Sequence, residues 1–377
     1  MAVKGESSFV AQLMSGLFSD VDMASIVLNH TSVILFRHIN NHGIDSLFEN
    51  ELLERQLDVI LSCLRALTCH EDNGALESCE GSTNSCTGRS TSICDICTNL
   101  LDSLCCPVLV HLVASEIFSD GNYRMVETVL SIVVPCFVSS TREAQTKMLH
   151  VLIDLLSCKA MKSLHLSVVG TLSCLCECPD DGAFDQTTTG DLLTVIENMC
   201  LTSEEPFVGR IFVQLVPSIL THDDRREVVT GRLWSTVEKS CSDANADDIS
   251  RCCFLICGLA DVLFSARNAS VSFTANLFSS STLWHCVQKG LQHAVALTRK
   301  RAIFILRRAL DFAGLISDSA ESTAVVDSTD VLNSVHCLCQ LSSVWHEVII
   351  LFETLEEKQV NLYLSVIMQI LFTVSGC

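Results

Sequence analysis

Apolar residues recur at helical spacing along most of this chain, and residues 123–157 show the pattern most clearly. An apolar stretch there carries Pro135 near its end, and Ser140 and Glu143 follow at the spacing of a capping box at a helix N-terminus. The next helix collects its apolar residues on one face: Ala144, Met148, Val151, Leu152 and Leu155. The pattern predicts two helices joined by a short turn, which is the unit of a HEAT-like repeat.

The same apolar-proline-apolar core recurs around Pro107 and Pro217. After Pro217, Thr221 and Asp224 indicate the capped start of another helix. Pro135 and Pro217 lie two typical HEAT periods apart, at about 40 residues per repeat. We therefore predict an all-α fold, an irregular HEAT/armadillo-like α-solenoid.

The pattern divides the chain into three parts. Residues 1–69 are expected to be N-terminal helices, and residues 70–95 a flexible loop rich in Ser and Cys. Residues 96–377 are expected to be HEAT/armadillo-like helical repeats. The last apolar helix, residues 363–374, lacks the polar outer face of a capping repeat, so we expect the array to end without a cap and to belong to something longer.

Composition agrees with packed helices. Apolar residues make up 49% of the chain, but aromatics only 6%, whereas strands favour aromatic and β-branched runs. Acidic residues outnumber basic ones 44 to 24, giving a net charge of −20. A surface this acidic repels polyphosphate, so nucleic acid could bind only at a local basic strip.

No membrane segment is expected. The first residues lack the apolar core of a secretory signal. The apolar runs 125–138 and 252–264 are too short for a membrane span, and each contains an acid, Glu127 and Asp261 respectively. We expect an intracellular protein, cytoplasmic and/or nuclear, with no membrane partner.

Enzyme motifs are missing. No two glycines are closer than seven positions, which excludes the glycine-rich loops that bind dinucleotides or phosphates. The sequence also has no HExxH, GxSxG or EF-hand pattern. We expect no catalytic residue and no cofactor in this chain.

The 22 cysteines raise the question of a metal site. A zinc site could be built from four of them: Cys79, Cys86, Cys94 and Cys97. Their spacing is not a paired CxxC motif, and Ile93 and Ile96 indicate the start of a helix there. We therefore favour reduced cysteines that pack as small apolar side chains in the core, with no metal.

Residues 296–310 place five positive charges on one predicted helix, after a predicted partner helix at residues 283–291. Its apolar face consists of Ala302, Ile303, Leu306, Ala309 and Leu310. The commoner interpretation of the opposite face, which includes Phe304, is a solvated or ion-paired surface. The more specific interpretation is that this face is a strip that binds RNA phosphates and bases. The RNA-binding candidates are Arg299, Lys300, Arg301, Arg307 and Arg308.

Two segments resemble a known family. Residues 296–310 and residues 345–360, which run from Trp345 through Glu353-Thr354-Leu355-Glu356-Glu357-Lys358-Gln359-Val360, are similar to the N-terminal helical region of the large eukaryotic tRNA guanosine 2′-O-methyltransferases, the TAR RNA-binding protein 1 family. The two segments cover about a tenth of the chain and contain no catalytic signature.

The resemblance implies a long HEAT- or armadillo-type solenoid followed by a C-terminal SPOUT domain, which binds S-adenosylmethionine and methylates the ribose of a D-loop guanosine. This chain contains no SPOUT motif, so we do not expect it to be an enzyme by itself. The expected role is a scaffold segment that helps position tRNA, with S-adenosylmethionine as a cofactor of the full-length family. The alternative is an acidic α-solenoid for protein interaction or homo-oligomerisation, without RNA contact.

Overall fold

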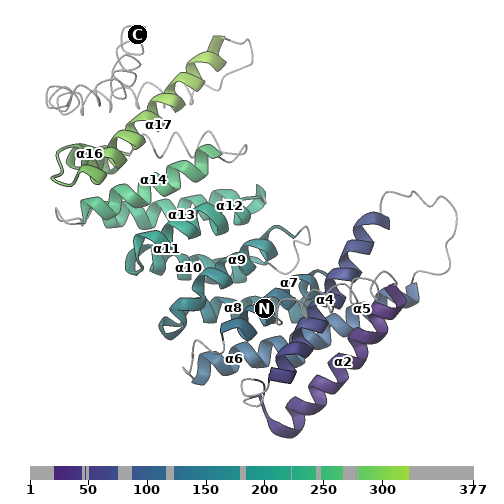
Figure 1. Ribbon diagram of the computed structural model, residues 1–377. Coiled ribbons are helices and arrows are strands. Elements are labelled where there is room, and N and C mark those ends of the chain that lie inside the picture. The colour runs from purple at the N-terminus through teal and green to yellow at the C-terminus, as the bar shows by residue number, and fades with distance from the viewer. Residues whose placement is uncertain are drawn as a thin grey trace, which may run out of the picture. The chain divides into compact units, whose positions relative to one another are not determined.

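The computed structural model describes residues 21–44, 47, 51–74, 87–115, 123–178, 184–221, 223–242, 248–265, 277 and 280–321. Within these ranges the regular elements are helices and no strand occurs, so the all-α prediction is confirmed (Figure 1). The chain forms two compact units, residues 1–195 and residues 196–377, and the boundary falls inside one helix, α10 (Gln186–Thr202).

The first unit is built from α2 (Val21–His42), α4 (Glu51–Gly74), α5 (Thr87–Leu100), the π-helical segment η1 (Leu101–Cys105), α6 (Cys106–Ser115), α7 (Tyr123–Val138), α8 (Arg142–Ser157), the 3₁₀ segment η3 (Lys159–Leu164), α9 (His165–Cys176) and most of α10. Helix α4 packs against both α2 and α7, α7 packs against α9, and α6 packs against α8. Helices α4 and α7 therefore each pack against one helix before and one helix after them in the chain.

Helices α7 and α8 are the two helices predicted for residues 123–157, and the predicted apolar face of α8 is buried. The predicted capping box is wrong. The N-cap of α8 is Thr141, so Ser140 lies one residue before the capping position. Its hydroxyl donates instead to the carbonyl of Phe137 at the end of α7, 3.0 Å away. The amide Nε2 of Gln145 donates to the same carbonyl at 2.7 Å, and together they fix the turn.

Pro107 and Pro217 share a local structure. The π-helical segments η1 and η4 (Ile211–Leu215) each end two residues before their proline. In each, an amide donates to the carbonyl five residues earlier, from Cys106 to Leu101 and from Val216 to Ile211. A proline ring clashes with the carbonyl of the preceding turn, and a widened π turn accommodates it. Pro135 differs, because it lies inside the α-helix α7.

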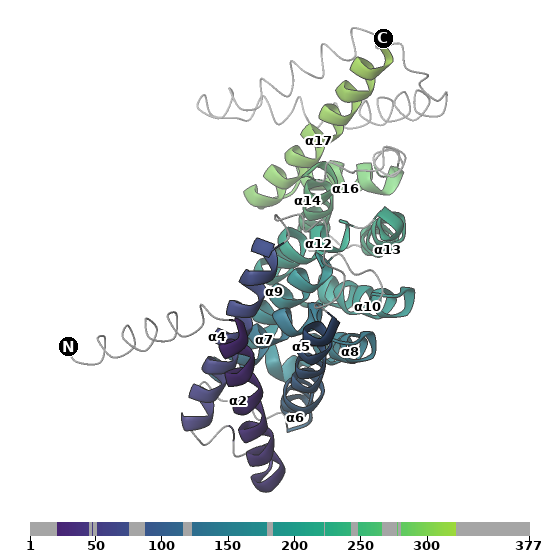
Figure 2. The ribbon, with the colours of Figure 1, turned by 90° about the vertical axis from the view of Figure 1, so that its right-hand side faces the viewer.

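The second unit contains the end of α10, then α11 (Glu205–Arg210), η4, α12 (Val216–Ile219), α13 (Asp223–Ser242), α14 (Ile249–Ser265), α16 (Ser281–Leu291) and α17 (Ala296–Glu321). Helices α13 and α14 pack together, as do α16 and α17. Helix α13 also packs on α16, and α14 packs on α17 (Figure 2). The two helix pairs therefore stack with first helix against first helix and second helix against second helix. Thr221, predicted to cap α13, instead donates to the carbonyl of Ser218 at the end of α12, 2.7 Å away.

Helices extend into the segment expected to be a loop. Helix α4 continues to Gly74 and α5 begins at Thr87, so residues 70–74 and 87–95 are helical, while residues 75–86 lie outside the described ranges. The buried residues Cys97 and Leu100 anchor α5 in the core. Adding residues to an existing helix costs little, so α5 extends back into polar sequence.

In the part of the chain that the structure describes, one helical stretch, Ile93–Ala114, is long and apolar enough to cross a membrane. We did not expect this stretch from the sequence, because Asp95 and Asp102 interrupt its run of apolar residues. Half of its apolar window is buried in the structure. Asp102 forms an ion pair of 2.8 Å with Lys147 of α8.

Candidate functional site: the basic helix α17

Helix α17 carries the five predicted RNA-binding residues, and α16 is its predicted partner helix. The apolar face of α17 packs against α14 and α16. Ala302, Leu306 and Ala309 are buried as predicted. Ile305 is fully buried as well and Ile303 only partly, so the buried face is rotated slightly from the predicted one. The side chain of Leu310 lies outside the described set.

Arg301 is a structural residue. Its side chain is 14% exposed, and both of its terminal nitrogens donate to the carboxylate of Glu205 in α11. Its guanidinium also lies 4.9 Å from the centre of the Phe254 ring in α14. A bidentate pair of this kind is strong and directional. It joins α17 to α11 and leaves little of the Arg301 charge for an external phosphate.

Arg308 and Arg299 also bind within the unit. Arg308 donates to Asp261 of α14 at 3.0 Å, and its guanidinium lies 5.0 Å from the centre of the Phe304 ring. Arg299 donates to the carbonyls of His293 and Ala294, at 2.7 and 2.8 Å. It thereby fixes the turn between α16 and α17.

Lys300 and Arg307 are the remaining two candidates, and both are exposed. Neither side chain forms a hydrogen bond or an ion pair with any residue in the described ranges. They lie seven positions apart, which places them on one face of the helix about 10 Å apart along its axis. The predicted five-residue strip is therefore reduced to these two fully available charges, with Arg308 at its edge.

The predicted zinc ligands are only partly described. Cys79 and Cys86 lie outside the described residues. Cys94 and Cys97 both lie on α5, and Cys97 is buried. A hydrogen bond with Cys97, together with burial, raises the pKa of the Cys136 thiol well above its usual value. Cys97 thus packs in the core, as favoured from the sequence.

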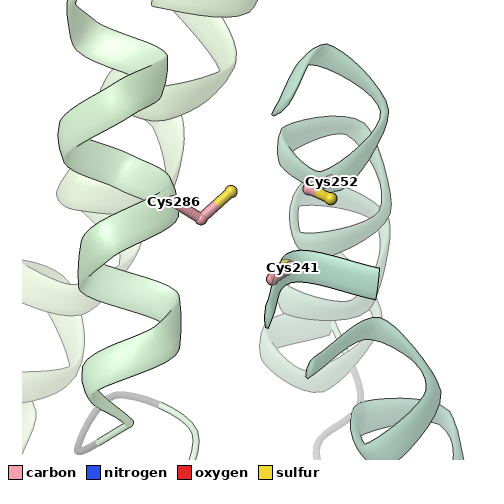
Figure 3. A group of neighbouring side chains, drawn as sticks. All are labelled: Cys241, Cys252 and Cys286. Carbon is pink, nitrogen blue, oxygen red and sulfur yellow. The ribbon is translucent and has the colours of Figure 1, made fainter. Parts of the chain in front are cut away.

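The structure contains a different cysteine cluster, which the sequence did not reveal. Cys241 of α13, Cys252 of α14 and Cys286 of α16 are buried, and their sulfur atoms all lie within 4.8 Å of one another (Figure 3). From the sequence, the cysteines in general were expected to pack in the core, and nothing connected these three with one another. The available signal was a cysteine in each of three consecutive amphipathic segments, which is weak because cysteine is common throughout this chain.

The three thiols influence one another. Hydrogen bonds from Cys241 and then Cys286 lower the pKa of the Cys252 thiol. The hydrogen bond to Cys252 raises the pKa of Cys241, and the hydrogen bond with Cys241 raises that of Cys286, with burial adding to both.

Comparison with known proteins does not assign the chain to a family. No protein-family model matches the chain, and no curated protein matches it. It is similar to a solved structure of an engineered protein, Northeast Structural Genomics Consortium target OR497, over 94% of this chain and 95% of that one. The sequence identity is 11% and the TM-score 0.34, so this likeness carries no argument.

Proposed function

We propose that this chain is a HEAT-like scaffold segment of a tRNA guanosine 2′-O-methyltransferase, and that α17 is part of its contact with tRNA. The observation that carries the proposal is the pair Lys300 and Arg307, two exposed cations on one helix face of a strongly acidic chain. The resemblance of residues 296–310 and 345–360 to that family supplies the substrate class.

The stacked helix pairs of the second unit support the HEAT-like part of the proposal. In HEAT arrays each repeat is two helices, and corresponding helices of adjacent repeats pack together. Helices α13 and α14 followed by α16 and α17 have this arrangement. The matching π turns before Pro107 and Pro217 support a repeated ancestry for their segments.

In this proposal the basic residues have different roles. Lys300 and Arg307 are the proposed phosphate contacts, and Arg308 contributes at the edge. Arg301 and Arg299 hold α17 against α11 and the preceding turn, so their role is to position the helix. Two contacts of this kind give weak binding, which suits a segment that assists a larger tRNA-binding surface.

Methyl transfer itself is not assigned to this chain. In the family that it resembles, S-adenosylmethionine binds to the C-terminal SPOUT domain, and the catalytic groups are there. We assign no catalytic residue here. The proposed contribution of this segment is to hold tRNA at a fixed position relative to that domain.

The proposal is tested by tRNA binding to the chain in which Lys300 and Arg307 are both replaced by alanine. The matched control replaces Lys159 and Lys162, two exposed lysines of η3, and so removes the same charge elsewhere. We expect the K300A/R307A variant to lose most tRNA binding and K159A/K162A to retain it. Equal loss in both variants would reduce the effect to net charge and contradict a site on α17.

A specific observation favours the second candidate, a module for protein interaction or self-association. Ile26 and Val33 of α2 are 62% and 45% exposed. They lie seven positions apart, on one face of the helix. If this candidate holds, the folded chain ignores tRNA but self-associates, and I26E/V33E is monomeric in sedimentation experiments. If the tRNA proposal holds, I26E/V33E binds tRNA as the unchanged chain does.

A further inference from the structure

The buried cysteine cluster joins three helices of the second unit. Cys241 lies in the last turn of α13, Cys252 near the start of α14 and Cys286 in the middle of α16. Cys286 projects from α16 toward the other two (Figure 3). The three residues are 5%, 1% and 1% exposed. Residues 45 positions apart in the sequence therefore present sulfur to one point in the core.

The spacing of the sulfur atoms fits a thiophilic cation. In a tetrahedral zinc site the Zn–S bonds are about 2.3 Å, which sets sulfur–sulfur distances of about 3.8 Å. The three sulfur atoms lie within 4.8 Å of one another, and small rotations about χ1 would close the difference. The sulfur of Cys253, a fully buried residue, lies 3.9 Å from that of Cys286, but Cys253 is not part of the group whose ligand atoms all lie within 4.8 Å of one another.

Simple packing of thiols in the core is the alternative explanation. Sixteen cysteines have side chains that the structure describes, and most of them are buried. Among those residues, this is the group in which three potential ligand atoms come this close together. The trio Cys97, Cys105 and Cys136 of the first unit is as deeply buried but does not converge in this way. Burial alone therefore does not produce the cluster.

We propose that Cys241, Cys252 and Cys286 bind one zinc ion and are three of the ligands of a structural site. Each thiol gives up its proton to water as its sulfur bonds to zinc, and no oxidation takes place. The ion connects α13, α14 and α16. It thereby fixes the two helix pairs whose packing presents α17, so the site stabilises the second unit and performs no chemistry.

The first test is metal binding by the full chain, kept reduced and stripped of metal. Cobalt(II) is titrated as a spectroscopic probe. We expect intense sulfur-to-cobalt charge-transfer bands and the visible bands of tetrahedral cobalt, saturating at about one ion per chain. Added zinc should bleach both and raise the midpoint of thermal unfolding. A cobalt titration without thiolate bands would overturn the proposal.

The second test compares two triple variants. C241A/C252A/C286A removes the proposed ligands, and C97A/C105A/C136A removes three equally buried cysteines of the first unit. We expect the first variant to bind zinc about a hundredfold more weakly or not at all, and the second to bind as the unchanged chain does. Equal zinc binding by the two variants would contradict the site.

A folding control separates loss of ligands from loss of structure. The single variant C252S keeps nearly the same volume and is checked by circular dichroism before titration. A folded C252S that has lost the tetrahedral cobalt spectrum supports the site. A folded C252S with the unchanged spectrum rejects Cys252 as a ligand and with it the proposed geometry.

Discussion

Arg301 of α17 and Glu205 of α11, 96 residues apart in the sequence, form a bidentate ion pair inside the second unit. The side chains are 14% and 34% exposed. Arg301, which the sequence pattern places on a charged surface strip, thus holds the helix in place. The neighbouring exposed charges, Lys300 and Arg307, depend on that positioning for any common action on a ligand.

Replacing Arg301 by methionine should destabilise the second unit by about 2 kcal/mol, because Glu205 would lose its partner while partly buried. The control R307M changes an exposed side chain and should stay within about 0.5 kcal/mol of the unchanged chain. Urea unfolding followed by the fluorescence of Trp234 and Trp284, both in this unit, measures the difference. Equal stability of R301M and R307M would show that the ion pair contributes little.

Two helical glycines of the second unit should respond in opposite ways to alanine. A Cβ at Gly258 would lie 2.8 Å from the ring of Phe212, a buried side chain, so G258A should cost about 1–3 kcal/mol through overpacking. A Cβ at Gly231 meets nothing within 4 Å, so G231A should stabilise α13 by about 0.5–1 kcal/mol. Thermal unfolding of both variants checks the prediction, and a stabilising G258A would refute the close packing of α14.

His165 should make the first unit sensitive to mild acid. Burial lowers the pKa of His165 from its ordinary value of 6.5, opposed by a hydrogen bond to the carbonyl of Cys158 and assisted by Lys162. The unfolded chain therefore binds the proton more readily than the folded one. The stabilising contribution is present above pH 6.5 and is lost as the pH falls from there through the lowered pKa.

The variant H165Q retains a donor for the Cys158 carbonyl and cannot be protonated. Its stability, measured by urea unfolding between pH 7.5 and pH 5, should therefore fall less steeply with acid than that of the unchanged chain. Parallel pH profiles for the two proteins would exclude His165 as the source of acid sensitivity.

Local patterns in the sequence predicted the helices well, because a helix with one buried face has apolar residues at a regular spacing of three to four positions. Ala302, Leu306 and Ala309 were correctly placed in the core. Helix ends were harder to predict, since Ser140 lies one residue before the N-cap of α8 and donates backward to the carbonyl of Phe137. A shift of one residue changes the partner of a capping side chain without changing the apolar pattern.

Long-range pairing could not be predicted from the sequence. Nothing near Arg301 indicates that its partner is Glu205, because that contact depends on how α11 and α17 pack. The convergence of Cys241, Cys252 and Cys286 depends in the same way on three helices and follows no local motif. The sequence indicated a group of basic residues on one helix, and packing decided which of them stay exposed.

The salt dependence of tRNA binding tests the central proposal most directly. Each phosphate contact adds to the slope of log affinity against log salt, by about 0.7 for a single strand and about 0.9 for a duplex. If Lys300 and Arg307 each contact a phosphate, the slope for K300A/R307A should be shallower by about 1.4–1.8. The slope for K159A/K162A should match that of the unchanged chain. Identical slopes for all three proteins, or no tRNA binding by the folded chain, would contradict an RNA contact on α17.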